Sequence, residues 1–251
     1  MDEASVVSLT CTVTILFSKN VNGIVSKNKI NNMQSMADKT IRFKRTIDPS
    51  YVEKGITYEE YRRLIDALIM VGRSTAKNQS ESLLEYSKLN VARMKRLDKT
   101  IEIIPALKTI IEKIQSPQTW LVLTEGWCGD AAQIVPVFAQ LAALNGNINL
   151  KFLLRDENLE LMDLYLTDAK SRSIPKLIVA NENLEELFTF GPRPDALQEI
   201  YYHMKANAFD NATIKEELHR WYAQDKTITI QKELLELLKQ ICVDCEEKKV
   251  A

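Results

Sequence analysis

The sequence contains few cysteines, and this scarcity bears on where the protein works. Four cysteines occur among 251 residues, at positions Cys11, Cys128, Cys242 and Cys245. A secreted domain held together by disulfides needs a denser set, so we expect a cytoplasmic protein in a reducing compartment. Only seven glycines and seven prolines are present, which argues against extensive disorder and against a turn-rich all-β fold.

The sequence also lacks an excess of either charge and any long apolar run. Lys and Arg number 33 against 34 Asp and Glu, a net charge of -1. Nucleic-acid binding requires a basic surface, so we exclude nucleic acid as the main partner. No apolar run reaches the roughly 18 residues of a membrane span, so we expect no membrane association. With 45% hydrophobic residues, a chain of this length can bury a core without a metal ion.

Residues 1–37 are predicted to be an extension to the folded protein. The apolar run Val6–Phe17 has the composition of a signal-peptide core, but acidic residues precede it where a signal peptide carries Lys or Arg. A polar run then leads to Met36, a second candidate start. The sequence leaves open whether this segment is an upstream extension, a disordered tail or a signal peptide.

Helices are predicted on both sides of a central region. Residues 38–99 form an N-terminal helical segment, in which Thr57 and Glu60 make a capping box. Residues 205–245 form a C-terminal helical extension with apolar residues at helical spacing, and 246–251 form a short charged tail.

Residues 100–204 alternate between strand and helix patterns. Strands are predicted at 100–104, 119–123, 148–154, 176–180 and 186–190. Helices are predicted at 106–114, 128–144, 159–170 and 195–204. Strands separated by helices pair in parallel, whereas the last two strands are close enough to form an antiparallel hairpin. The expected fold class is therefore α/β, a small mixed sheet flanked by helices, with extra helices at both ends.

The candidate site follows a buried strand, where a short turn places Cys128 at the start of a helix. Free backbone N–H groups and the helix dipole favour a negative charge there, so we predict a lowered pKa and an enhanced reactivity for this thiol. Trp127 can shelter the sulfur, and Gly129 lets another backbone approach closely. A lone cysteine is ordinarily a small buried hydrophobe, so an inert or purely binding role is the alternative.

Two carboxylates beside the cysteine each have two interpretations. Glu125 is a candidate proton carrier, or simply an exposed loop residue. Asp130 either opposes a thiolate through like charge or caps the helix.

The turn Trp127–Asp130 resembles the active-site turn of the thioredoxin superfamily, which ordinarily reads Trp-Cys-Gly-x-Cys. Pro136 lies within the following helix, where thioredoxins carry a kinking proline. Ser173–Pro175 precedes a strand, as the cis-proline loop of that family does, and Gly191 follows the last hairpin strand where thioredoxins have a glycine. The resemblance covers about Thr100–Met204.

The resemblance implies a cis bond before Pro175 and a loop that faces the cysteine and pairs with the backbone of a bound peptide. Ile174 and Pro175 would form the second half of the site. The substrate-binding residues expected on this basis are Trp127, Gly129, Asp130, Ile174 and Pro175.

The sequence departs from the family pattern at two positions. Ala131 stands where the second cysteine of the motif belongs, and Val122 replaces a buried acidic residue. A dithiol reductase needs a resolving thiol, so here that thiol must come from glutathione, a partner or the tail. Cys242 and Cys245 are candidates, although their CxxC spacing without a second ligand pair favours chance over a redox pair or half a zinc site.

The function predicted first is a monothiol oxidoreductase in cell redox homeostasis, acting through Cys128 on protein or glutathione disulfides. It needs no bound cofactor, and glutathione is a candidate thiol co-substrate. The alternative is a non-catalytic module that binds an extended peptide or protein. A glutaredoxin-like iron–sulfur carrier is disfavoured because no glutathione-binding residues can be identified. The extra helices resemble those of a bacterial branch of thioredoxin-like proteins; the sequence does not specify the oligomeric state.

Overall fold

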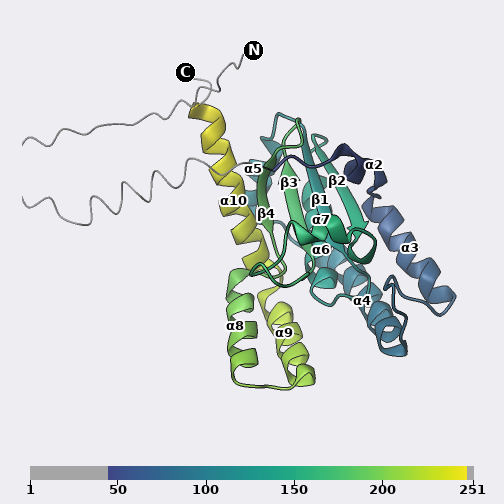
Figure 1. The fold of residues 1–251 in the computed structure, drawn as a ribbon. Helices are drawn as coiled ribbons and strands as arrows, with labels where there is room; N and C mark the ends of the chain where they lie inside the picture. The colour runs from purple at the N-terminus through teal and green to yellow at the C-terminus, as the bar shows by residue number, and fades with distance from the viewer. Residues whose placement is uncertain (1–44, 248–251) are drawn as a thin grey trace, which may run out of the picture. The chain divides into compact units, whose positions relative to one another are not determined.

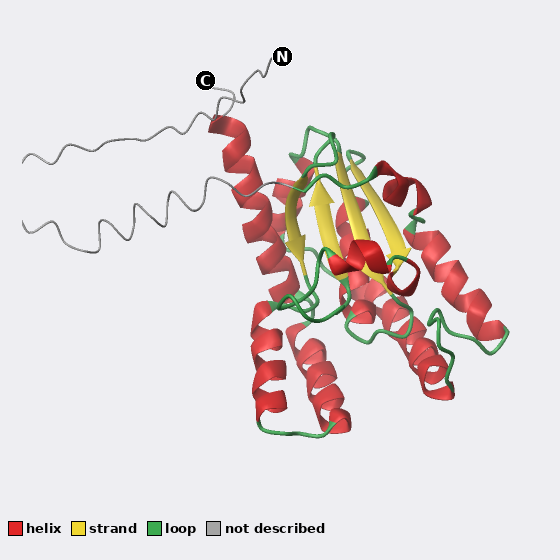
Figure 2. Ribbon diagram, in the orientation of Figure 1, coloured by secondary structure: helices red, strands yellow, loops and turns green. Residues whose placement is uncertain are grey.

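The computed structural model describes residues 45–247, with side chains described as far as residue 241. The extension predicted at 1–37, including Cys11, and residues 248–251 lie outside the described part. Figure 1 shows the order of the elements along the chain, and Figure 2 distinguishes the yellow strands from the helices around them.

The described residues form a four-stranded mixed sheet in the order β2-β1-β3-β4. Its strands are β1 Gln118–Thr124, β2 Ile148–Leu154, β3 Lys176–Ala180 and β4 Glu186–Phe190. β1 pairs in parallel with β2 and antiparallel with β3, and β3 pairs antiparallel with β4. Every residue of β1 and β3 is buried, as expected for strands at the centre of a sheet covered on both faces.

Helices surround this sheet and extend beyond it. They are α2 Pro49–Lys54, α3 Tyr58–Met70, α4 Glu81–Thr100, α5 Pro105–Glu112, α6 Ala131–Ala142, α7 Leu159–Asp163, α8 Asp195–Ala206, α9 Asn211–Asp225 and α10 Ile228–Glu247, with a 3-10 turn at Arg155–Glu157. α4 packs on α6, α10 packs on α5 and β4, and α8 contacts α9. Figure 1 shows α8 and α9 side by side beyond one end of the sheet. None of the helices described is long and apolar enough to cross a membrane.

The capping box predicted before α3 is confirmed. The Thr57 N–H donates to Glu60 Oε2 at 2.8 Å, and the Glu60 N–H donates to Thr57 Oγ1 at 3.2 Å. α3 then buries Tyr61, whose ring stacks on Phe152 of β2 at 5.3 Å. The Tyr61 hydroxyl lies 3.3 Å from Oγ1 of Thr124, the last residue of β1. The N-terminal helical segment therefore packs directly behind the turn that carries the candidate site.

The strand predicted at 100–104 is wrong. α4 continues to Thr100, and residues 101–104 have no regular structure before Pro105 begins α5. Their backbone groups pair with a side chain instead of a neighbouring strand: Gln231 of α10 accepts from the Ile104 N–H at 2.8 Å and donates to the Glu102 carbonyl at 3.0 Å. This amide satisfies two backbone groups that a neighbouring strand would otherwise pair.

Two predicted helices are shorter than expected. The helix predicted at 159–170 ends at Asp163. It could not have continued to 170, because Asp168 and Ala169 both have a φ of 54°, which a right-handed helix cannot accommodate. The helix predicted at 128–144 begins at Ala131, so Cys128 lies in the turn before it. The other four predicted strands and the remaining helices agree with the structure within a few residues.

Candidate functional site

Cys128 lies between the end of β1 and the first turn of α6. Its N–H donates to the Glu125 carbonyl at 3.1 Å, and its own carbonyl accepts from the Ala132 N–H at 3.1 Å. The sulfur accepts a hydrogen bond from the Ala131 N–H at 3.5 Å, one of the donors at the helix start that have no partner within the helix. The side chain is 8% exposed. The predicted contact between thiol and helix terminus is therefore present, but in a largely buried setting.

The loop before β3 faces this sulfur, as the family resemblance implied. The Ile174–Pro175 peptide bond is cis, and the Cys128 thiol donates to the Ile174 carbonyl at 3.3 Å. Gly191 supports the loop from behind with a φ of 105°. A Cβ at that position would lie 2.2 Å from the Pro175 carbonyl oxygen, so only glycine fits.

The predicted lowering of the Cys128 pKa is wrong, because burial outweighs the helix terminus. Burial, followed by the charge of Asp130, raises the pKa of the Cys128 thiol to about 12. The Ala131 N–H and the guanidinium of Arg193 act in the opposite direction. The hydrogen bond to the Ile174 carbonyl also favours the protonated form, since only a neutral thiol can donate it. At rest, the site holds a neutral thiol.

Asp130 does not cap the helix. Its side chain makes no capping hydrogen bond; it pairs with Arg193 at 2.7 Å and accepts from the Tyr222 hydroxyl at 3.0 Å. The Asp130 and Arg193 side chains are only 12% and 13% exposed. Of the two interpretations of Asp130, the like-charge effect on Cys128 is the one that the geometry supports.

Glu125 is fully buried, so its interpretation as an exposed loop residue is wrong. The Thr75 hydroxyl donates to one carboxylate oxygen, and the Asp156 N–H donates to the other at 3.0 Å. Burial raises the pKa of Glu125 to about 7. A carboxyl group that titrates near neutrality can accept and return a proton, as the proton-carrier interpretation requires. Thr75 also accepts the Gly126 N–H at 2.9 Å, and so ties Glu125 to the turn.

The neighbour of Gly129 is a side chain and not the backbone that we expected. A Cβ on Gly129 would lie 2.7 Å from Cε1 of His219, which α9 supplies. Burial, with Arg93 and Lys215 nearby, lowers the pKa of His219 to about 4, so the imidazole is neutral at pH 7. α9 therefore closes one side of the turn with an uncharged ring.

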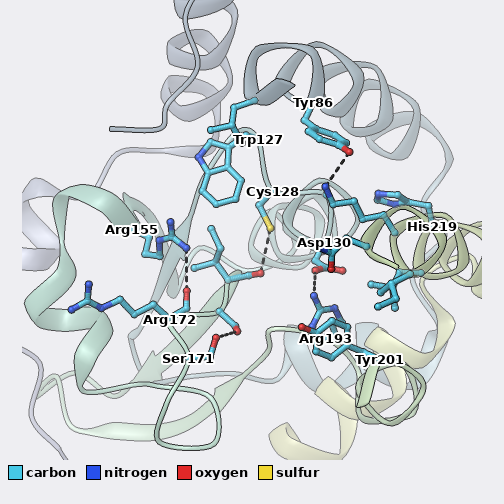
Figure 3. A pocket seen from close by; sticks show the side chains of 18 of the residues that line it. Tyr86, Trp127, Cys128, Asp130, Arg155, Ser171, Arg172, Arg193, Tyr201 and His219 are labelled. Carbon is cyan, nitrogen blue, oxygen red and sulfur yellow. Dashed lines mark hydrogen bonds and ion pairs between the residues drawn. The ribbon is translucent and has the colours of Figure 1, made fainter. Parts of the chain in front are cut away.

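Cys128 lies in a cavity of about 460 Å³. Figure 3 shows it near the centre, with Trp127 and Arg155 on one side and Asp130, Arg193 and His219 on the other. The guanidinium of Arg155 lies 5.0 Å from the Trp127 ring centroid. Five basic side chains line the cavity: Arg155, Arg172, Arg193, Lys205 and Lys215. Sequence reasoning missed all five because they come from separate loops and helices, and no local pattern links them.

The tail cysteines are carried away from this cavity within one chain. The Asp195 N–H donates to Glu233 of α10 at 2.9 Å, which fixes that part of the helix near the site. Position 242 is nine residues further along α10, about 14 Å at the rise of an α-helix. In Figure 1 this end of α10 lies at the opposite end of the sheet from α8 and α9. The side chains of Cys242 and Cys245 lie outside the described residues.

Within residues 45–241, no group of three or more His, Cys, Asp or Glu side chains is arranged to hold a metal ion. Asp130 is the only carboxylate among the described residues that line the cavity.

Comparison with known proteins places the fold. Two solved structures are similar: a protein of unknown function from Pseudomonas aeruginosa (16% identity, TM-score 0.53) and an HIV epitope scaffold (15% identity, TM-score 0.51). Each comparison covers 76% of this chain and 96% of the other. A search of curated proteins found no match. A family model described as thioredoxin matches residues 76–208, more than half of the chain. This protein therefore belongs to the thioredoxin family, and α9 and α10 lie outside the matched region.

Proposed function

We propose that the protein carries out thiol–disulfide exchange through Cys128 as a single reactive thiol. The observation that carries the proposal is the position of its sulfur, in a cavity between the cis-proline loop and the first N–H groups of α6. A disulfide that enters the cavity would meet this sulfur from the open side. The role is redox homeostasis in the reducing cytosol that the cysteine content predicts.

The exchange conserves atoms and electrons without another reactant. The Cys128 thiolate attacks one sulfur of a disulfide, a new sulfur–sulfur bond forms, and the old bond releases the second sulfur as a thiolate. The Ala131 N–H and Arg193 favour the attacking thiolate. We assign the transfer of the thiol proton to Glu125 because its pKa is near 7 and it lies three residues before Cys128. In the structure its carboxylate bonds to Thr75 and to the Asp156 N–H, so the carboxylate must turn or act through water to reach the sulfur.

Release of the mixed disulfide requires a second thiol from outside the turn. Ala131 supplies none, and α10 carries Cys242 and Cys245 away from the cavity. Glutathione or a partner thiol then attacks the mixed disulfide and regenerates Cys128. The proposed substrates are disulfides of proteins or of glutathione, and these steps require no bound cofactor.

A lone-thiol variant tests the proposal. Cys11, Cys242 and Cys245 are changed to Ser, so that Cys128 is the remaining thiol. Incubation with the neutral hydroxyethyl disulfide should add one mercaptoethanol to the intact mass, peptide mapping should place it on Cys128, and reduced glutathione should remove it. If the folded protein stays unmodified while the urea-unfolded protein reacts, the exchange proposal fails.

A second candidate function, a non-catalytic binding module, is favoured by one observation. Cys128 is 8% exposed and its pKa is raised to about 12, as for a packing residue. In that case an extended peptide without cysteine should bind equally to the wild type and to Cys128→Ala, and no disulfide should modify the folded protein. Modification of Cys128 by any disulfide would exclude this alternative.

A further inference from the structure

The charges around the cavity are unbalanced. The three arginines are paired with carboxylates: Arg155 with Asp156 at 2.7 Å, Arg172 with Asp163 at 2.6 Å, and Arg193 with Asp130 at 2.7 Å. The two lysines are not so paired within the described residues. Lys205 donates to the Asn211 amide oxygen at 2.8 Å, and Lys215 donates to the Tyr86 hydroxyl at 3.1 Å.

These neutral partners hold the lysines in place without cancelling their charge. Lys205 also lies 6.0 Å from the Tyr201 ring centroid and Lys215 4.5 Å from that of Tyr86, which orients both ammonium groups at the cavity wall. Arg93, next to Gly129, likewise bonds an amide oxygen, Asn90 Oδ1 at 2.9 Å. Positive charge therefore exceeds negative charge around the open side of the thiol.

A helix forms one wall of the cavity beside the Trp127–Asp130 turn. α9, which lies outside the family model, contributes Ile214, Leu218 and His219 to the wall. The Ile174 carbonyl already accepts the Cys128 thiol. A cavity of about 460 Å³ has the size of a small-molecule site.

From these observations we infer that the substrate of Cys128 is a small disulfide whose halves carry carboxylates. This rests on the proposed function and names its substrate class. Lys205 and Lys215 attract the carboxylates, while α9 keeps folded proteins from the sulfur. Attack by Cys128 forms the mixed disulfide with one half and releases the other half as an anionic thiol; one disulfide is consumed and one is formed.

Three small disulfides of different charge test this inference on the lone-thiol variant. Oxidised glutathione carries net negative charge, hydroxyethyl disulfide is neutral, and cystamine is positive. Rates of mixed-disulfide formation at low ionic strength are divided by the rates for the same chain unfolded in urea, which removes differences in intrinsic reactivity. The normalised rate should be highest for oxidised glutathione, lower for hydroxyethyl disulfide and lowest for cystamine. Added salt should reduce the differences between these rates because it screens exposed charges.

Two lysine variants provide the matched comparison. Lys205→Gln with Lys215→Gln should slow the reaction with oxidised glutathione about five- to tenfold and leave that with hydroxyethyl disulfide within about twofold. Lys108→Gln with Lys239→Gln, two exposed lysines on other helices, should change neither rate. Insulin, as a protein disulfide, should react more slowly than oxidised glutathione.

Different results would contradict the substrate class and the proposed function. If Cys128 reacts with all three reagents at equal normalised rates, or if insulin reacts fastest, the substrate class is wrong and thiol exchange still stands. If Cys128 reacts with none of them in the folded state, the proposed function itself fails.

Discussion

Replacing Asp130 with asparagine should make Cys128 more reactive. The Asp130 carboxylate is the second largest cause, after burial, of the raised pKa of the thiol. It also holds Arg193 in a 2.7 Å ion pair, whereas Arg193 by itself lowers that pKa. Asparagine removes the negative charge but keeps an oxygen that can accept from Arg193 and from the Tyr222 hydroxyl. The loss of the Asp130 charge and the unpaired charge of Arg193 should both lower the pKa of Cys128.

The expected magnitude follows from the size of the pKa shift. A rise from 9.0 to about 12 lowers the thiolate fraction at pH 7 about 1000-fold. The same rise makes the thiolate about 15- to 30-fold more nucleophilic, so the buried thiol should exchange roughly 30- to 60-fold more slowly than an ordinary one. A variant that lowers the pKa of Cys128 by one should therefore exchange about three- to fourfold faster. Since Cys128 remains buried in Asp130→Asn, this variant should recover only part of the lost exchange rate.

The assay is the rate of exchange with hydroxyethyl disulfide, measured on the lone-thiol variant between pH 6 and 10. Asp163→Asn is the matched control, because Asp163 also pairs with an arginine of the cavity wall but does not contribute to the pKa of Cys128. A thermal melt checks that the variant remains folded, since Arg193 loses the negative charge of a largely buried partner. An unchanged or slower rate in folded Asp130→Asn would refute the electrostatic account.

Three further predictions concern other residues of the site. Folding raises the pKa of Glu125 from 4.5 to about 7. The neutral carboxyl therefore stabilises the fold below pH 4.5, and this stabilisation is lost as the pH rises through 7. In the wild type the free energy of unfolding should fall by about 3 kcal/mol between pH 4.5 and 7, and in Glu125→Gln this fall should be absent, as measured by urea titration. Equal pH slopes in both proteins would contradict it. Gly129→Ala places a methyl group 2.7 Å from the His219 ring and should destabilise the fold by about 1–3 kcal/mol, whereas Gly146→Ala, with nothing within 4 Å, should have little effect on the melting temperature; similar losses in both would refute the close contact. Ala131→Cys, one turn from the active thiol, should form an internal disulfide on mild oxidation, seen as the loss of two titratable thiols; two persistently free thiols would show that the turn cannot close.

Much of the fold could be predicted because its signals are local. The capping box at Thr57, the apolar run of β1 and the hairpin of β3 and β4 are each encoded within a few residues. The strand predicted at 100–104 failed because the Gln231 amide, far away in the sequence, takes its backbone hydrogen bonds. No local pattern carries that information.

In the candidate site, too, the features encoded locally were predicted and those set by tertiary packing were not. The Trp127–Asp130 turn and the cis-proline loop were identified from short motifs. The state of the thiol was predicted in the wrong direction, because a helix terminus is visible in the sequence but the burial of Cys128 is not. Burial likewise decides the pKa of Glu125, and the α9 side chains that close the cavity reach it only through tertiary packing.

Catalysed turnover tests the central claim most directly. Hydroxyethyl disulfide, reduced glutathione, glutathione reductase and NADPH report each cycle of mixed-disulfide formation and release on the protein as loss of absorbance. The wild type and the variant that retains Cys128 alone should turn over at the same rate. The rate with Cys128→Ser should not exceed the rate without protein. Equal turnover by Cys128→Ser and the wild type would contradict the assignment of thiol exchange to this site.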